Sequence, residues 1–182
     1  PAQDSALHLA RSVKKWGTPQ YSNGYICRNP HRNNQMHHYD MNLCYIDELL
    51  WHFKWTGDLD YVRQMWPVIT RHLTKLNYDP DNDGLYDAYA CIWASDALYY
   101  NSGAVTHSSA YNYRANKTAA QLAEKIGEDP TPYRNEAEKI LKAMNERLWL
   151  PDKGHWAEYQ DFMGHKRVHE SAAVWTIYHA ID

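Results

Sequence analysis

The sequence is poor in cysteine, in phenylalanine and in long apolar runs, and these shortages exclude several classes of protein. Its three cysteines, Cys27, Cys44 and Cys91, are widely spaced and odd in number, which fits neither a disulfide framework nor a metal-binding motif. We expect them to be small buried side chains. The longest apolar runs are a few residues, far short of a membrane-spanning helix.

An excess of basic residues is also lacking. The 19 Lys and Arg against 22 Asp and Glu give a formal net charge of −3, which argues against a general nucleic-acid-binding protein. The length of 182 residues predicts a single domain over residues 1–182. The opening Pro1-Ala-Gln-Asp has no signal-peptide pattern and is typical of mature or truncated sequence, so the compartment does not follow from it.

The aromatic residues are present in an unusual ratio: 15 Tyr and 8 Trp against 2 Phe. Tyr and Trp combine a flat apolar face with a hydrogen-bonding edge. A sugar ring offers the matching surface, with an apolar C–H face and a rim of hydroxyls. Composition alone therefore favours a carbohydrate site and a Tyr- and Trp-filled helical core about equally.

Apolar residues recur at helical spacing in six segments, and no segment alternates as a strand, so we predict an all-α fold. The segment over 39–55 is apolar on nearly all sides, which predicts burial on most sides, whereas 59–76 and 133–148 are one-sided. The six predicted helices cover residues 4–16, 39–55, 59–76, 105–126, 133–148 and 168–181.

The connections alternate in length. They are short after the mostly buried helices and long after the one-sided ones, where they cover residues 17–38, 77–103 and 149–167. Inner and outer helices therefore alternate as stacked hairpins, as in a solenoid or a closed α/α toroid, with every long loop at one end. The loop from Asp79 to Gly103 is too aromatic to be disordered, so we expect it to line a site.

The segment from Tyr111 to Trp156 contains YNYRANKTAAQLAEKIGED, followed by YRNEAEKILKAMNERLWLPDKGHWAEY. It resembles the six-hairpin glycosidases, the (α/α)6-barrel glycoside hydrolases, and among them the α-L-rhamnosidase-like members. A complete toroid of that family has twelve helices and this chain supplies about half, so the resemblance implies a fragment that the remainder of its own polypeptide completes. It also implies a carbohydrate substrate and a periplasmic or extracellular location.

The resemblance implies catalysis by two carboxylic acids, one protonating the leaving oxygen and one activating water or attacking the sugar. Asp96 is the predicted acid, because Trp93, Tyr99 and Tyr100 surround it in sequence and burial against aromatic rings raises a carboxyl pKa. The family pattern has Gly-Asp-Trp where this sequence has Trp-Ala-Ser-Asp, and this departure leaves Asp87 as an alternative.

The predicted second carboxylate is Glu158, which lies between Trp156 and Tyr159 in a long connection. Asp161 and Glu170 are alternatives, and we expect Glu170 in the first turn of the last inner helix, with its carboxylate pointing into the cup. The family often takes this carboxylate from a later hairpin, so it could also lie outside the chain.

Sugar contacts are expected from polar and aromatic residues in or beside the long loops. A metal site among the loop histidines is disfavoured, because adjacent histidines in a loop rarely both bind one ion. A plain polar loop fits residues 31–40 as well as a sugar site does. The predicted substrate-binding residues are Arg32, His37, His38, Asp40, Trp93, Tyr99, Tyr100, His107 and Trp156.

No cofactor is expected, with one alternative. Asp79-x-Asp81-x-Asp83-Gly84 resembles the start of a calcium loop, but Ala90 occupies the twelfth position, where the bidentate Glu would stand. An Asp-rich turn after an outer helix is the favoured interpretation.

Three functions remain open on the sequence. The first is an inverting glycoside hydrolase acting on oligo- or polysaccharides. The second is a polysaccharide lyase, which would use His107, Tyr111, Asn112 and Arg32 to abstract a proton beside a uronate carboxylate. The third is a non-catalytic carbohydrate-binding or scaffold domain built from helical hairpins.

Overall fold

The structure is a computed structural model that describes residues 20–26, 39–75, 78–89, 102–161, 165–172 and 180. Within these residues four of the six predicted helices are confirmed to within two residues at each end; the predicted helix over 4–16 lies outside them, and the one over 168–181 is wrong in its first, described residues. None of the described helices is long and apolar enough to cross a membrane. The helices are α2 (Tyr39–Thr56), α3 (Leu59–Lys75), α4 (Thr106–Ile126) and α5 (Thr131–Arg147).

Tight reversals join the helices in two hairpins. Gly57 adopts a left-handed φ of 63° after α2, and the Asp58 side chain accepts a hydrogen bond from the Tyr61 N–H at 3.0 Å, which caps α3. Gly127, at φ 84°, ends α4, and its N–H donates to the Ala123 carbonyl. Both short connections predicted from the sequence are therefore present, and residues that commonly cap helices form them.

The all-α prediction is wrong in one respect, because two small antiparallel sheets accompany the helices. The four-stranded sheet has the order β1-β2-β5-β6, and β3 pairs with β4. Strands of two to four residues are too short to show alternation, and the pairing of β2 with β5 joins segments more than fifty residues apart. The strands are β1 (Asp87–Tyr89), β2 (Ser102–Val105), β3 (Trp149–Leu150), β4 (His155–Trp156), β5 (Tyr159–Gln160) and β6 (Val168–His169).

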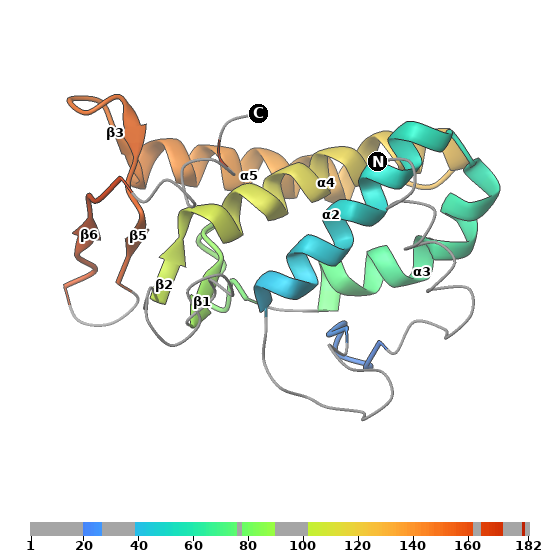
Figure 1. Ribbon diagram of the computed structural model, residues 1–182, viewed down its shortest axis with the longest axis horizontal. Helices are drawn as coiled ribbons and strands as arrows, with labels where there is room; N and C mark the ends of the chain where they lie inside the picture. The colour runs from blue at the N-terminus through green and yellow to red at the C-terminus, as the bar shows by residue number, and fades with distance from the viewer. Residues whose placement is uncertain are drawn as a thin grey trace.

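The four-stranded sheet lies at the end of the molecule where α4 begins and α5 ends (Figure 1). Strand β2 comes from the long connection 77–103 and pairs with β5 from the connection 149–167. The prediction that these two long connections meet at one end is confirmed. Val168 lies in β6, so the last predicted helix does not begin there.

Helix α4 is central and packs against α2, α3 and α5. It is buried along most of its length, as predicted for an inner helix. Two cores flank it. The first joins α2, α3 and α4, and it contains Ile46, Leu49, Phe53, Val62, Ile69, Ala119 and Ala123. The second joins β2, α4 and α5, and it contains Leu85, Val105, Ala110, Ile140, Met144 and Leu148.

Helix α2 is less buried than its composition predicts. It packs against α3 and α4, which leaves Met41, Trp51 and Trp55 exposed, Trp55 by 66%. The Arg114 guanidinium lies 4.8 Å from the centre of the Trp51 ring. Cys44, also on α2, is half-buried and its Sγ lies 3.5 Å from the Tyr111 hydroxyl, so the prediction of a buried cysteine is wrong at this position.

Candidate functional site

Buried polar side chains occupy the first turns of α4, directly after β2. The Ser109 hydroxyl accepts from the Tyr86 N–H at 3.0 Å, and the Asn112 amide donates to the Tyr39 hydroxyl at 2.7 Å. Buried polar groups of this kind fix position because each must keep its partner. The inner helix is thus tied by directional contacts to the segments that precede it.

Glu158 lies between this helix end and the sheet. Its backbone N–H donates to the His169 carbonyl at 2.9 Å, and its own carbonyl accepts from the Thr106 N–H at 3.1 Å. The side chain is buried, with the residue 2% exposed. Oε2 accepts a hydrogen bond from the Ser171 hydroxyl, while buried Oε1 has no hydrogen-bond partner among the described residues. A buried carboxylate oxygen left unpaired is costly, so Glu158 calls for an explanation.

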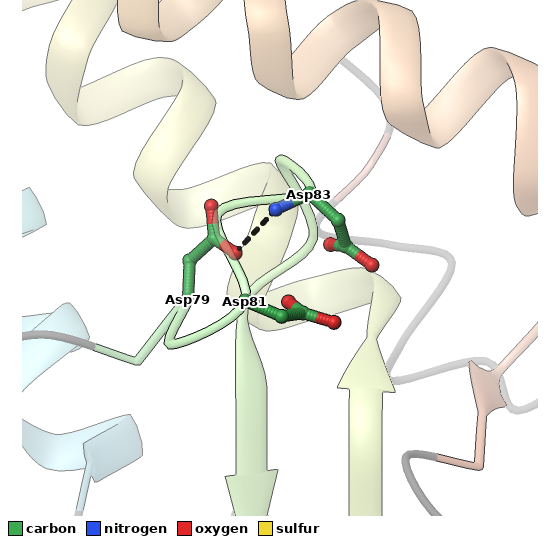
Figure 2. A group of neighbouring side chains, drawn as sticks. All are labelled: Asp79, Asp81 and Asp83. Atoms are coloured by element: carbon green, nitrogen blue, oxygen red, sulfur yellow. Dashed lines mark hydrogen bonds between the residues drawn. The ribbon is translucent and has the colours of Figure 1, made fainter.

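A second acidic group lies beside the sheet in the turn that precedes β1. We call Asp79, Asp81 and Asp83 the acidic loop; one carboxylate oxygen from each lies within 4.8 Å of the others. Figure 2 shows the three side chains on one tight turn, with Asp79 accepting the Asp83 N–H at 2.9 Å. Asp79 also accepts the Gly84 N–H at 3.0 Å. This is the Asp-rich turn that the sequence favours.

Each carboxylate of the acidic loop already has a cationic partner. Lys139 Nζ lies 3.1 Å from Asp79 Oδ2, Arg147 pairs with Asp83, and Lys166 Nζ lies 3.4 Å from Asp81 Oδ2. The three oxygens could approach a metal, but they would give up these contacts to hold one, so the donor set fits a calcium ion poorly.

Asp87, the first residue of β1, has the carboxyl whose environment suits an acid. It is half-buried, and burial, followed by the negative charge of the acidic loop, raises its pKa to about 6, against a smaller opposing effect of Lys166. An acid with a pKa close to the working pH can donate a proton efficiently. Asp87 pairs with Ala104, and Ala104 with Gln160, so β1, β2 and β5 bring Asp87 into the same sheet as Gln160, which follows Glu158 by two residues.

The two alternatives for Glu158 lie in different surroundings. Glu170 is exposed, follows β6 and pairs with Lys153 at 2.9 Å, so the expected position in a helix's first turn is wrong. Asp161 is partly exposed and lies 3.1 Å from His169 Nε2. Neither carboxylate is buried as Glu158 is.

The structure describes two of the predicted sugar-binding side chains. His107 is buried, with 1% exposure, in the first turn of α4. Trp156 in β4 meets Trp149 edge-on, with 4.8 Å between ring centres, and it borders a groove of about 180 Å³ between α4 and α5. Tyr113 and Arg114 line the same groove.

The other predicted residues are not described. Asp40 lies in the first turn of α2, but its side chain is outside the description. The residues that lie outside the described part of the chain are Arg32, His37, His38, Trp93, Asp96, Tyr99 and Tyr100. The contact of Ser171 with Glu158 does not follow from the sequence, because a serine just after a two-residue strand carries no recognisable signal.

Comparison with known proteins decides the family. Residues 71–179 match the Mannosylglycerate hydrolase MGH1-like glycoside hydrolase domain. The chain belongs to this MGH1-like family. No curated protein matches the chain.

Solved structures share the fold of this MGH1-like domain at low sequence identity. A rhamnosidase from Klebsiella oxytoca with rhamnose bound has a TM-score of 0.57 and 16% identity, over 82% of this chain and 28% of that one. A GH78 family rhamnosidase of Bacillus sp. GL1 has a TM-score of 0.68 and 16% identity, over 89% and 17%. The expected resemblance to six-hairpin, rhamnosidase-like glycoside hydrolases is confirmed. The MGH1-like chain spans less than a third of either matched chain.

Proposed function

We propose that this MGH1-like domain hydrolyses glycosidic bonds in oligo- or polysaccharides by carboxylate acid–base catalysis with inversion. Family membership supports the reaction class. The observation that carries the proposal is Glu158, a buried carboxylate with one oxygen held by Ser171 and the other without a described partner. Because the chain spans 28% and 17% of the matched rhamnosidases, we infer that further helices of the same polypeptide complete the cup.

In the proposed mechanism Glu158 is the base. It removes a proton from a water molecule as that water attacks the anomeric carbon, and an acid on the opposite side gives its proton to the leaving oxygen. The two protons balance, and the configuration at the anomeric carbon inverts. Asp96 is the acid that the sequence favours, and Asp87 is the alternative that its raised pKa favours.

The lyase alternative is weaker in this structure. Burial raises the pKa of the Tyr111 hydroxyl, which makes it a poorer base at neutral pH. Asn112 is buried and donates to Tyr39 and to the Ser108 carbonyl, so its amide is engaged within the protein.

The proposal can be tested with the full protein on a panel of aryl glycosides and polysaccharides. The panel includes α-L-rhamnosides and mannosylglycerate because of the matched structures and the family description. NMR of the first product anomer reports inversion or retention. Retention, or an unsaturated product absorbing in the ultraviolet, would contradict the mechanism.

Separate substitutions identify the acid. The variant that removes the acid, either Asp96→Asn or Asp87→Asn, should have a kcat lower by about 10²- to 10⁴-fold. Added azide should not give a glycosyl azide with retained configuration, because the proposed mechanism inverts. An aryl glycoside with a good leaving group should recover most of the lost rate. If both variants turn over at the wild-type rate, neither residue is the acid.

A further inference from the structure

We propose that a cleft bordered by α3, α4 and α5 binds a neutral hydroxylated ring of the monosaccharide class. The cleft has a volume of about 370 Å³, within the range of roughly 300–1,000 Å³ that is typical of small-molecule sites. The end of α3, the turn that contains the acidic loop and the first half of α5 line it, together with Asn116 of α4. None of the described carboxylates assigned to catalysis lines this cleft, so the inference does not depend on the proposed hydrolysis.

Two polar side chains in the cleft have an oxygen without a hydrogen-bond partner among the described residues. Asn116 is buried, with 2% exposure, and its amide nitrogen donates to the Asn112 carbonyl at 2.9 Å, which leaves Oδ1 without a partner. Glu136 accepts from the Tyr86 hydroxyl at 3.1 Å through Oε1, which leaves Oε2 available. Because an unsatisfied buried polar atom is costly, Asn116 favours a ligand that donates a hydrogen bond.

The Lys139 ammonium disfavours a charged ligand. Its Nζ lies 3.1 Å from Asp79 Oδ2, 2.8 Å from Asn82 Oδ1 and 3.0 Å from Glu136 Oε1, so all three of its N–H donors are engaged. An amine or a metal ion in the cleft would meet this fixed positive charge, and an anion would meet the carboxylates of Asp79 and Glu136. Neutral hydroxyl groups can donate to the two available oxygens without either repulsion.

The cleft also has an apolar side. Tyr86 and Tyr133 line it and are both buried, and the Tyr133 ring meets Trp66 edge-on with 5.5 Å between ring centres. Leu73 and Pro132 complete this side. A pyranose ring has an apolar C–H face surrounded by hydroxyls, so it can contact the aromatic side with its face and the two oxygens with its rim.

Asn116 offers a local reporter for binding in this cleft. It lies about 15 Å along α4 from Thr106, whose N–H donates to the Glu158 carbonyl. A sugar bound at the cleft should therefore shift the side-chain amide resonances of Asn116 directly, whether or not a second sugar molecule occupies the proposed catalytic site.

The test is an NMR titration of the full protein labelled with nitrogen-15 asparagine, with D-mannose and L-rhamnose as separate probes and Asn116→Ala to assign the resonances. At least one sugar should shift the Asn116 amide saturably, with a Kd in the millimolar range expected for so small a ligand. Thr74→Arg adds a long cationic side chain at an exposed position on the cleft rim and should weaken binding by about tenfold or more. Gln64→Arg, also exposed on α3 but not lining the cleft, is the matched control and should keep the wild-type Kd.

The inference is overturned if neither sugar gives a saturable shift at Asn116, or if folded Thr74→Arg protein binds with the wild-type Kd. Methylammonium chloride is the probe for a cation site, and saturable binding of methylammonium in place of the sugars overturns the ligand class. The two proposals fail separately: wild-type turnover by Glu158→Gln contradicts the proposed hydrolysis and leaves the sugar titration at Asn116 unchanged.

Discussion

His72 gives the domain a stability that depends on pH in a direction set by its burial. The side chain is buried on α3, its Nδ1 has no hydrogen-bond partner among the described residues, and burial lowers its pKa from 6.5 to about 4. The unfolded chain binds the proton more tightly than the folded one, so stability is full above about pH 6.5 and falls as the pH drops toward 4. The pKa falls by about 2.5 units, and at about 1.4 kcal/mol per unit the full loss of stability below pH 4 is about 3.5 kcal/mol.

The assay is urea unfolding at pH 7.5 and at pH 4.5, for the wild type and for His72→Leu. Leucine cannot titrate and removes an unpaired polar atom, so the variant should be close to the wild type at pH 7.5 and more stable at pH 4.5 by about 2–3 kcal/mol. His165→Leu changes an exposed histidine and serves as the control. The reasoning is refuted if the difference in unfolding free energy between the wild type and His72→Leu changes by less than about 0.5 kcal/mol from pH 7.5 to pH 4.5.

Three further predictions concern the turn before β1. Gly84→Ala should destabilise by about 2–4 kcal/mol, because φ is +88° and an added Cβ would lie 3.0 Å from the Lys139 carbonyl; Gly154→Ala, at φ +71° in open space, should cost about 1–2 kcal/mol in the same thermal unfolding experiment. Calcium and a chelator should give the same melting temperature, because the acidic loop already has cationic partners; a rise with calcium contradicts this. Asp87→Asn should raise the stability at pH 7.5, because a carboxyl whose pKa is raised by folding loses stability as the pH rises through about 6. If the difference in stability between the variant and the wild type is the same at pH 7.5 and at pH 4, the raised pKa of Asp87 is contradicted.

Helix positions followed from the sequence because their signals are local. The apolar spacing that predicted α3 and the Gly127 stop after α4 are both decided within a few residues of chain. The alternation of short and long connections also placed two loops at one end correctly, because it depends on the order of elements and not on contacts.

The sheet and the surroundings of the site did not follow, because they depend on pairing between distant segments. Asp87 reaches the sheet through Ala104 and Gln160, and no short window of sequence contains those partners. Glu170 was expected in a helix, and this position is wrong for the same reason: a helical apolar pattern extended to Val168, but Val168 pairs with β5 as part of a strand. Glu158 was identified from its aromatic neighbours, whereas its burial and its bond to Ser171 are visible only in three dimensions.

The central claim is that Glu158 acts as the base of a glycoside hydrolase. The most direct measurement is the initial rate of Glu158→Gln beside Glu138→Gln, an exposed glutamate on α5, with the full protein and its best glycoside substrate. The account predicts a fall in kcat of about 10²- to 10⁴-fold for Glu158→Gln, unchanged substrate binding, and a wild-type rate for Glu138→Gln. Equal rates for the two folded variants would contradict it.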